Sequence, residues 1–450
     1  MSEYFSLDKP NLKNIDVKKV TEALFNSEGQ KLRGFIDSLN EPDYLFWDKV
    51  KYKEPLPNKD LTKEELWQTV KMMRHITSIN TIIKNEKGGF FTWLKLPQLE
   101  KFFHEVDMNT GGELFVLKSD FDKATKQKLI SRGVMEEAIA SSQLEGASTS
   151  RRLAKQFLRE GRKPRNESEK MILNNYLSMK AIEDGYKDKK MSLSLLYELH
   201  GSITKDTLTP EGEVPRLRNK GEDIFVVDRT TGIIYHKAPD IDFVKEELER
   251  FVKFANDELD DSFIHPIVKA IMIHFWIAYL HPFTDGNGRL ARLLFYWYLL
   301  KNGYWAFAYL PISKIIKKSP KQYSMAYVYS EQDDNDLTYF IDYNIAKIKM
   351  AVKEFKTYLH EQTEANKVMN KVVRTNYDLN DRQIRLLQYL HGDSEARTSI
   401  KIHSSINQIT RKTATQDLKK LAALGFLDIK QVGRKLHYFA NKKIEKLFKQ

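Results

Sequence analysis

Apolar and polar residues alternate with a helical period along most of this chain, which predicts a mainly α-helical fold. Two stretches are strongly apolar, residues 266–280 and 293–300, and both read as buried helices. The second stretch ends at Asn302-Gly303, a suitable helix C-cap. Weaker helical patterns cover residues 17–39, 61–86 and about 337–375.

Two short β-rich runs interrupt this pattern, at residues 224–227 and 233–235, around a turn that contains Gly232. We predict one isolated hairpin there, in an otherwise helical domain. Its candidate strand residues are Ile224, Phe225, Val226, Ile234 and Tyr235. Because such a hairpin has exposed edges, it can accept an extended segment of another chain. The alternative is a hairpin with a structural role only.

The last 80 residues carry nearly all of the excess positive charge. The chain has a formal net charge of +12, and residues 371–450 hold 17 Lys and Arg against 7 Asp and Glu. A helix capped by Asp381, a short second helix, a third helix capped by Thr410 and a two-stranded wing over 426–439 resemble a winged helix-turn-helix. Candidate contacts to double-stranded DNA are Arg411, Lys412, Thr415, Lys419, Arg434 and Lys435. The alternative is a module for dimerisation or target capture whose basic face is merely solvated.

Composition narrows the class of protein. Cysteine is absent from the 450 residues, which excludes disulfides and thiolate metal sites and favours a reducing cytoplasm. No uninterrupted apolar run approaches ~20 residues, so we expect a cytoplasmic protein without a membrane span. We predict three parts: a helical region at 1–115, a catalytic domain at 116–365, and a linker helix with the winged module at 366–450.

The connection between the two apolar helices concentrates the chemistry of the chain. It reads His281-Pro-Phe-Thr-Asp-Gly-Asn-Gly-Arg-Leu-Ala-Arg292. Arg289 and Arg292 fall in the first turn of the second helix, where cations oppose the helix dipole, so a polyanionic ligand is expected there. The glycines let backbone N–H groups approach an anion. His281 is the candidate base near neutral pH, and Asp285 can hold a Mg²⁺ ion that bridges phosphates.

This segment resembles the HPFx(D/E)GNGRxxR motif of the Fic protein family at every position. The resemblance implies a compact helical bundle that, with Mg²⁺, transfers AMP from ATP to a Ser, Thr or Tyr hydroxyl of a target protein. In that family His281 would deprotonate the hydroxyl, Phe283 would seat the loop in the core, and Asp285 would hold Mg²⁺. Arg292 would meet the terminal phosphate. The remaining phosphate-binding residues would be Gly286, Asn287, Gly288 and Arg289.

A second, upstream segment runs from Ser141 to Gly146 and resembles the (S/T)xxxE(G/N) inhibitory motif of Fic proteins. Val134, Ala138, Ser141 and Glu145 share one helix face by their spacing. The resemblance implies an inhibitory helix over about 123–146, in which Glu145 pairs with Arg292 and excludes the productive pose of the γ-phosphate. The alternative is an ordinary helix end with a solvated glutamate.

The predicted hairpin falls where Fic proteins carry a flap that clamps an extended target segment, and residues 211–219 and 235–239 resemble its flanking stretches. Two classes of function follow. The chain is either a self-inhibited protein adenylyltransferase, or a DNA-binding regulator whose Fic site senses nucleotide or modifies the regulator itself. A Fic enzyme could also run in reverse as a de-AMPylase, or use UTP, GTP or CDP-choline, and a homodimer is a further expectation.

Overall fold

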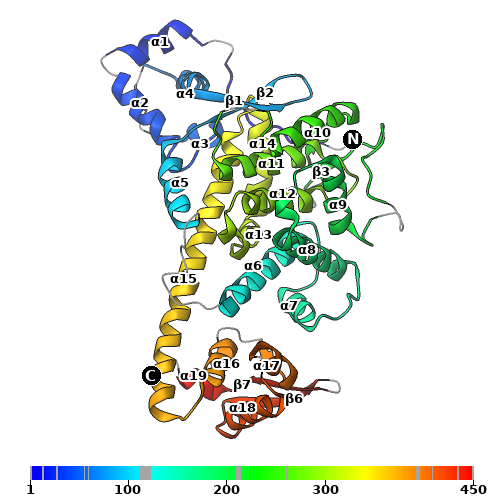
Figure 1. Ribbon diagram of the computed structural model, residues 1–450. Helices are drawn as coiled ribbons and strands as arrows, with labels where there is room; N and C mark the ends of the chain where they lie inside the picture. The colour runs from blue at the N-terminus through cyan, green and yellow to red at the C-terminus, as the bar shows by residue number, and fades with distance from the viewer. Residues whose placement is uncertain are drawn as a thin grey trace. The chain divides into compact units, whose positions relative to one another are not determined.

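The computed structural model describes residues 3–447, apart from 13–14, 27–28, 55, 59, 111–122, 209–213, 229, 260–261, 392–395, 408 and 433–434. The fold is mainly helical, as the sequence predicted, with a few small sheets (Figure 1). The chain divides into two compact units, Met1–Val352 and Lys353–Gln450. Within the described residues, no helix combines the length and the apolar character needed to span a membrane.

The first unit contains most of the elements. They are α1 (Val17–Phe25), α2 (Gly29–Ser38), α3 (Trp47–Val50), α4 (Lys63–Thr77), β1 (Ser78–Lys84), β2 (Phe90–Leu94), α5 (Pro97–Thr110), α6 (Lys123–Leu144), α7 (Arg151–Glu160), α8 (Glu167–Asp184), the 3-10 helix η1 (Tyr186–Asp188), α9 (Leu193–Thr204), β3 (Phe225–Val227), β4 (Ile234–Lys237), α10 (Ile241–Ala255), α11 (Pro266–Leu280), α12 (Asn287–Lys301), the 3-10 helix η2 (Trp305–Tyr309), α13 (Ile312–Ile316), α14 (Pro320–Gln332) and the first part of α15 (Thr338–Asn376).

Helices α11 and α12 form the centre of this unit. Every residue of α11 from Ile267 to Leu280 is buried, and so are nearly all residues of α12, so these two helices are apolar all round because they face protein on every side. They pack against each other, while α6, α8 and α9 contact α12 and α10 contacts α11 (Figure 1). The polar connection 281–286 therefore lies at one end of the most buried helix pair.

Two expectations for residues 1–115 were wrong. The helix predicted over 61–86 ends at Thr77, and Ser78–Lys84 forms β1, which pairs antiparallel with β2. The β-branched side chains of this stretch favour a strand over a helix. The described part of the unit thus holds the β1–β2 hairpin in addition to the β3–β4 hairpin. The helix predicted over 17–39 is two helices, because the chain turns to an extended conformation at Asn26.

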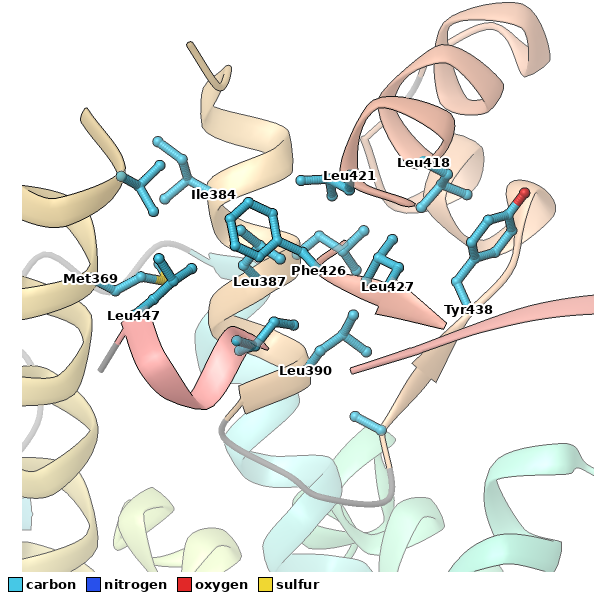
Figure 2. Packing of buried hydrophobic residues seen from close by; sticks show 14 residues of the cluster. Met369, Ile384, Leu387, Leu390, Leu418, Leu421, Phe426, Leu427, Tyr438 and Leu447 are labelled. Carbon is cyan, nitrogen blue, oxygen red and sulfur yellow. The ribbon is translucent and has the colours of Figure 1, made fainter. Parts of the chain in front are cut away.

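The second unit is built from the end of α15, α16 (Asp381–His391), β5 (Arg397–Thr398), α17 (Ile400–Asn407), α18 (Arg411–Ala423), β6 (Leu427–Val432), β7 (Lys435–Ala440) and α19 (Lys442–Leu447). Helix α16 is capped by Asn380 rather than by the predicted Asp381. Strand β7 pairs antiparallel with both β5 and β6, so the predicted two-stranded wing has a third strand. Leu387, Leu418, Leu421 and Phe426 meet in the core of this unit (Figure 2).

Candidate active site

His281 ends α11 in a left-handed conformation (φ +43°), which turns the chain sharply away from the helix. Its backbone N–H still bonds the Ile277 carbonyl at 3.1 Å. The ring nitrogen Nδ1 contacts the carbonyl oxygen of Ala278. Because a carbonyl can only accept, Nδ1 must carry the proton, and the lone pair of the neutral imidazole lies on Nε2. The site therefore presents Nε2 of His281 as a base.

The surroundings keep this imidazole neutral. Burial, and then the nearby His236, lower the pKa of His281 to about 4. The two rings lie 6.1 Å apart between centroids. His236 bonds Glu331 through Nδ1 at 2.7 Å and the Tyr279 carbonyl through Nε2 at 2.8 Å. Burial alone would lower the pKa of His236, but Glu331 outweighs it and raises that pKa.

The loop after His281 is fixed from inside the unit. Phe283 is fully buried and stacks on His200 with ring centroids 3.7 Å apart. The side-chain amide of Asn287 accepts from the Phe283 N–H at 3.0 Å and donates to the Phe283 carbonyl at 2.8 Å. His200 Nε2 donates to the Asp285 carbonyl at 2.8 Å. The Asn287 amide thus closes the loop, and the place of this residue in a phosphate cradle stays a prediction.

Gly286 has φ +84° and stands as the N-cap of α12. A Cβ at this position would lie 2.6 Å from the methyl group of Thr204, so both the backbone angle and the available space call for glycine. The turn brings the first N–H groups of α12 to the end of the helix, where the helix dipole favours an anion.

Arg289 is fully buried, and protein groups bind both of its terminal nitrogens. Nη1 donates to the Ile203 carbonyl and Nη2 to Asp285 Oδ2, each at 2.9 Å. Its Nε makes no hydrogen bond to the described residues. Arg289 therefore links the end of α9 to the loop, and its role as a phosphate ligand stays a prediction.

Arg292 is the second buried guanidinium of α12. Its Nε donates to the Ser141 hydroxyl at 2.8 Å, and Nη2 donates to the Ser141 carbonyl at 3.0 Å and to Glu145 Oε1 at 2.8 Å. Its side chain is 4 % exposed and that of Glu145 27 %. Burial by itself would raise the pKa of Glu145, but Arg292 outweighs it and lowers that pKa. The structure thus brings together the two motifs singled out in the sequence.

The Glu145 carboxylate also lies against the first turn of α12. A Cβ added to Gly288 would be 2.2 Å from Glu145 Oε1, so the carboxylate occupies the space directly over this glycine. Negative charge is favourable at a helix N-terminus. Glu145 therefore places its negative charge at the start of α12, and α6 ends just before it, where Gly146 adopts φ +104°.

The β3–β4 hairpin borders this site on one side. His236 of β4 bonds the carbonyl of Tyr279, which stands two residues before His281 in the chain. Phe225 and Val227 of β3 are 40 % and 45 % exposed. Ile224 is half-buried and accepts from the Ala238 N–H at 2.9 Å. Ile234 is buried, and the Tyr235 hydroxyl donates to Asp228 at 3.1 Å. The predicted strand residues therefore lie in or next to this hairpin.

Residues 3–9, here called the strap, cover the outer edge of β4. Tyr4 pairs with Ile234 in parallel orientation, with Phe5 N to Ile234 O at 2.8 Å and Ile234 N to Glu3 O at 2.9 Å. The side-chain amide of Gln332, at the end of α14, makes two hydrogen bonds to the strap. Its Oε1 accepts from the Leu7 N–H and its Nε2 donates to the Phe5 carbonyl, each at 2.9 Å. The hairpin is a two-stranded sheet, and the strap adds a single parallel bridge to the edge of β4.

Comparison with known proteins identifies the stretch that carries this site. Residues 190–299 match the model of the Fic/DOC family. They form a Fic domain. The protein adenylyltransferase Fic of Nematostella vectensis is 45 % identical over 62 residues, 13 % of this chain and 14 % of that protein. The protein adenylyltransferase fic-1 of Caenorhabditis elegans is 41 % identical over 63 residues, 14 % of this chain and 12 % of that protein.

The chain therefore spans only about an eighth of the length of these curated relatives. A solved structure of a Fic family protein from Desulfovibrio desulfuricans G20 superposes with a TM-score of 0.49 at 18 % identity, covering 77 % of this chain and 96 % of that chain. This likeness is too low to establish the fold of the whole chain. The sequence match to the Fic domain carries the assignment.

Asp285 is the carboxylate of the Fic domain that could hold a metal ion. Its side chain is 55 % exposed, and its Oδ2 is already oriented by Arg289. Magnesium is commonly bound by one or two carboxylates together with phosphate oxygens of a substrate. An exposed, oriented carboxylate beside a helix N-terminus fits that requirement, whereas no cluster of three or more metal-binding side chains occurs among the described residues.

Three supporting residues of the Fic domain were not assigned a role from the sequence. His200 and His236 hold the loop and the hairpin, and Arg218 donates from Nε to the His281 carbonyl at 3.0 Å. Their partners lie far away in the chain, so local spacing gives no sign of them. Arg218 and His236 each carried a signal, because they stand in the stretches 211–219 and 235–239, of which 211–213 lie outside the described residues.

In the second unit, the exposed face of α18 presents Arg411, Lys412 and Lys419. The Thr415 hydroxyl donates to the Arg411 carbonyl one turn earlier, at 2.7 Å. Arg434 and the side chain of Lys435 lie outside the described residues. The interior of the unit is polar at one point, where the buried Asp417 binds Arg382, Asn380 and His403.

Proposed function

We propose that this protein is a self-inhibited protein adenylyltransferase. It would use ATP to place AMP on a Ser, Thr or Tyr hydroxyl of a target protein or of its own chain. The observation that carries the proposal is the juxtaposition of a neutral imidazole, whose free lone pair lies on Nε2, with the N-terminus of a buried helix. The names of the curated relatives support the same chemistry.

In the proposed reaction, His281 Nε2 takes the proton of the target hydroxyl, and the hydroxyl oxygen forms a bond to the α-phosphorus of ATP. The bond between the α- and β-phosphates breaks, and pyrophosphate leaves. The N–H groups at the start of α12 stabilise the negative charge on the phosphates. Arg292 orients the terminal phosphate once it is free to do so. Asp285 would hold Mg²⁺, which when bound neutralises phosphate charge and orients the leaving group.

Glu145 would hold this reaction back. It accepts a hydrogen bond from Arg292 at 2.8 Å and occupies the space over Gly288, so it competes with an anion for both the guanidinium and the helix N-terminus. Inhibition of this kind is competitive for the position of the terminal phosphate, because ATP can still bind through its other groups. The nucleotide would then sit with its α-phosphate out of line with the attacking oxygen.

The test is transfer of label from ATP that is labelled at the α-phosphate, followed by mass spectrometry of the modified protein. We expect weak labelling of the wild type, strong labelling of Glu145→Gly and none of the Glu145→Gly/His281→Ala double variant. A parallel incubation with UTP, GTP and CDP-choline determines the nucleotide. Release of AMP from a modified protein, without any forward transfer, would assign the reverse reaction instead.

A second candidate function rests on the second unit. Its helices and antiparallel sheet occur in the order of a winged helix-turn-helix, and α18 exposes Arg411, Lys412 and Lys419 where a recognition helix would carry its DNA contacts. We propose that this unit binds double-stranded DNA. The measurement is DNA binding by the full chain at several salt concentrations, with His281→Ala as the control that should bind equally well.

A further inference from the structure

Helices α6 and α12 meet along a regular series of contacts that begins outside the inhibitory motif. The pairs are Glu137 with Tyr296, Ser141 with Arg292, and Glu145 with Gly288. The residue number rises by four on α6 at each step and falls by four on α12. The helices therefore run antiparallel, and one face of α6 carries all three contacts.

Glu137 makes the first of these contacts, and its carboxylate is 3 % exposed. Oε2 accepts from the Tyr296 hydroxyl and from the Ser313 N–H, each at 2.9 Å, and the Ser313 hydroxyl contacts Oε1. Tyr296 belongs to α12, and Ser313 to α13. A single buried carboxylate therefore joins three helices of the unit.

We propose that Glu137 is a positioning residue that sets α6 against α12 and thereby keeps Glu145 over Arg292. This inference rests on the proposed self-inhibition. Glu137 and Glu145 are eight residues apart on one helix, roughly 12 Å along its axis. Because a helix moves as a unit over that length, a change at the first contact shifts or tilts the last one. The proposal predicts that loosening Glu137 releases inhibition without touching the inhibitory motif.

The neighbouring Glu136 provides a matched control. It is a buried carboxylate on the same helix, 4 % exposed, but its partners Arg151 and Lys155 belong to α7. Glu136→Gln removes a buried carboxylate from the same helix, and the melting temperature of each variant records its own loss of stability. It leaves the contacts to α12 and α13 in place, so it should not release inhibition.

The experiment measures the initial rate of self-modification of the full chain from α-labelled ATP, with a melting temperature for each variant. Glu137→Gln and Glu136→Gln are each made in the wild type and in Glu145→Gly. In the wild type we expect Glu137→Gln to raise the rate roughly threefold to tenfold. In the Glu145→Gly background, where no inhibition remains, adding Glu137→Gln should change the rate by less than about twofold, as expected for residues that act through one contact. Tyr296→Phe, which removes the hydroxyl on α12, should behave in the same way.

Each other outcome counts against the proposal. A folded Glu137→Gln with no rise, an equal change in both backgrounds, or an equal rise in Glu136→Gln would assign Glu137 to general stability alone. If Glu137→Gln does not fold, the test uses Tyr296→Phe, whose effect on the rate is compared between the wild type and Glu145→Gly in the same way. If Glu145→Gly itself transfers no AMP, the proposed function fails first and the positioning role fails with it.

Discussion

Replacing Glu145 by glycine is the most direct test of self-inhibition. The expected gain in transfer rate can be estimated from the contacts of this side chain. Glu145 accepts a charged hydrogen bond from Arg292 at 2.8 Å, and its side chain is 27 % exposed. A hydrogen bond to a charged group contributes about 1.5–3 kcal/mol. Arg292 keeps both of its bonds to Ser141, so the rest of the site stays in place. The variant should therefore gain about tenfold to a hundredfold in transfer rate.

The assay is the initial rate of AMP incorporation at saturating ATP and Mg²⁺, with ATP affinity measured separately. Glu145→Gln keeps the shape of the side chain and loses its charge, so we expect an intermediate gain. Arg292→Ala breaks the same pair but also deletes the proposed phosphate ligand, so it should not be activated. The double variant should resemble Arg292→Ala alone, because the two residues act as one unit.

Two results would refute this reasoning. One is a Glu145→Gly protein that is folded, binds ATP and transfers no AMP. The other is an Arg292→Ala protein as active as Glu145→Gly, since that would leave the freed guanidinium without a role. A melting temperature separates either result from misfolding. Glycine near the end of α6 costs about 1 kcal/mol in backbone freedom, and loss of the bond to Arg292 adds to this, so a lower melting temperature is expected.

Four further predictions follow from the same site and from the second unit. His281→Ala should abolish transfer and leave ATP binding nearly unchanged, and retained transfer would remove this base from the mechanism. Burial lowers the pKa of His281 to about 4, and Glu145→Gly removes a carboxylate that raises it, so kcat/KM of this variant should stay level as pH falls from 7 to 5; a decline centred at 6.5 would contradict the burial argument. Asp285→Ala should weaken Mg²⁺-dependent nucleotide binding and transfer together, whereas full activity in excess chelator would exclude a metal-assisted reaction. Neutralising Arg411, Lys412 and Lys419 should weaken DNA binding and lower its salt slope by about one per lost phosphate contact, and an unchanged slope would favour a protein-binding role.

The sequence predicted the parts of the molecule that depend on local pattern. The apolar runs define α11 with its observed ends, and the period of four between Ser141 and Glu145 places both side chains toward α12. Helix α12 starts earlier than its apolar run because Gly286 caps it. These features follow from residues within one or two turns of one another, where periodicity and capping rules apply.

Long-range contacts could not be predicted in this way. His236 meets Glu331 and His200 meets the Asp285 carbonyl across long separations in the chain, and nothing near either histidine indicates its partner. Asn287 was assigned to the phosphate cradle, which stays a prediction, and its spacing gave no sign that its side-chain amide closes the loop on Phe283. The strand at 78–84 was assigned to a helix because its apolar spacing fitted both periods.

The strap has a consequence for how samples of this protein behave. A two-stranded hairpin is marginally stable by itself in water, and the strap adds a parallel bridge from Tyr4 to Ile234 at the edge of β4. Proteolytic clipping or a bulky tag at this end would leave the Ile234 N–H and carbonyl without their strand partners, next to the element that holds His236. Two preparations with identical Fic domains could then differ in amide exchange at β4 and in their tendency to associate edge to edge. Differences between preparations of this protein would then begin at the edge of β4, outside the segment 281–292.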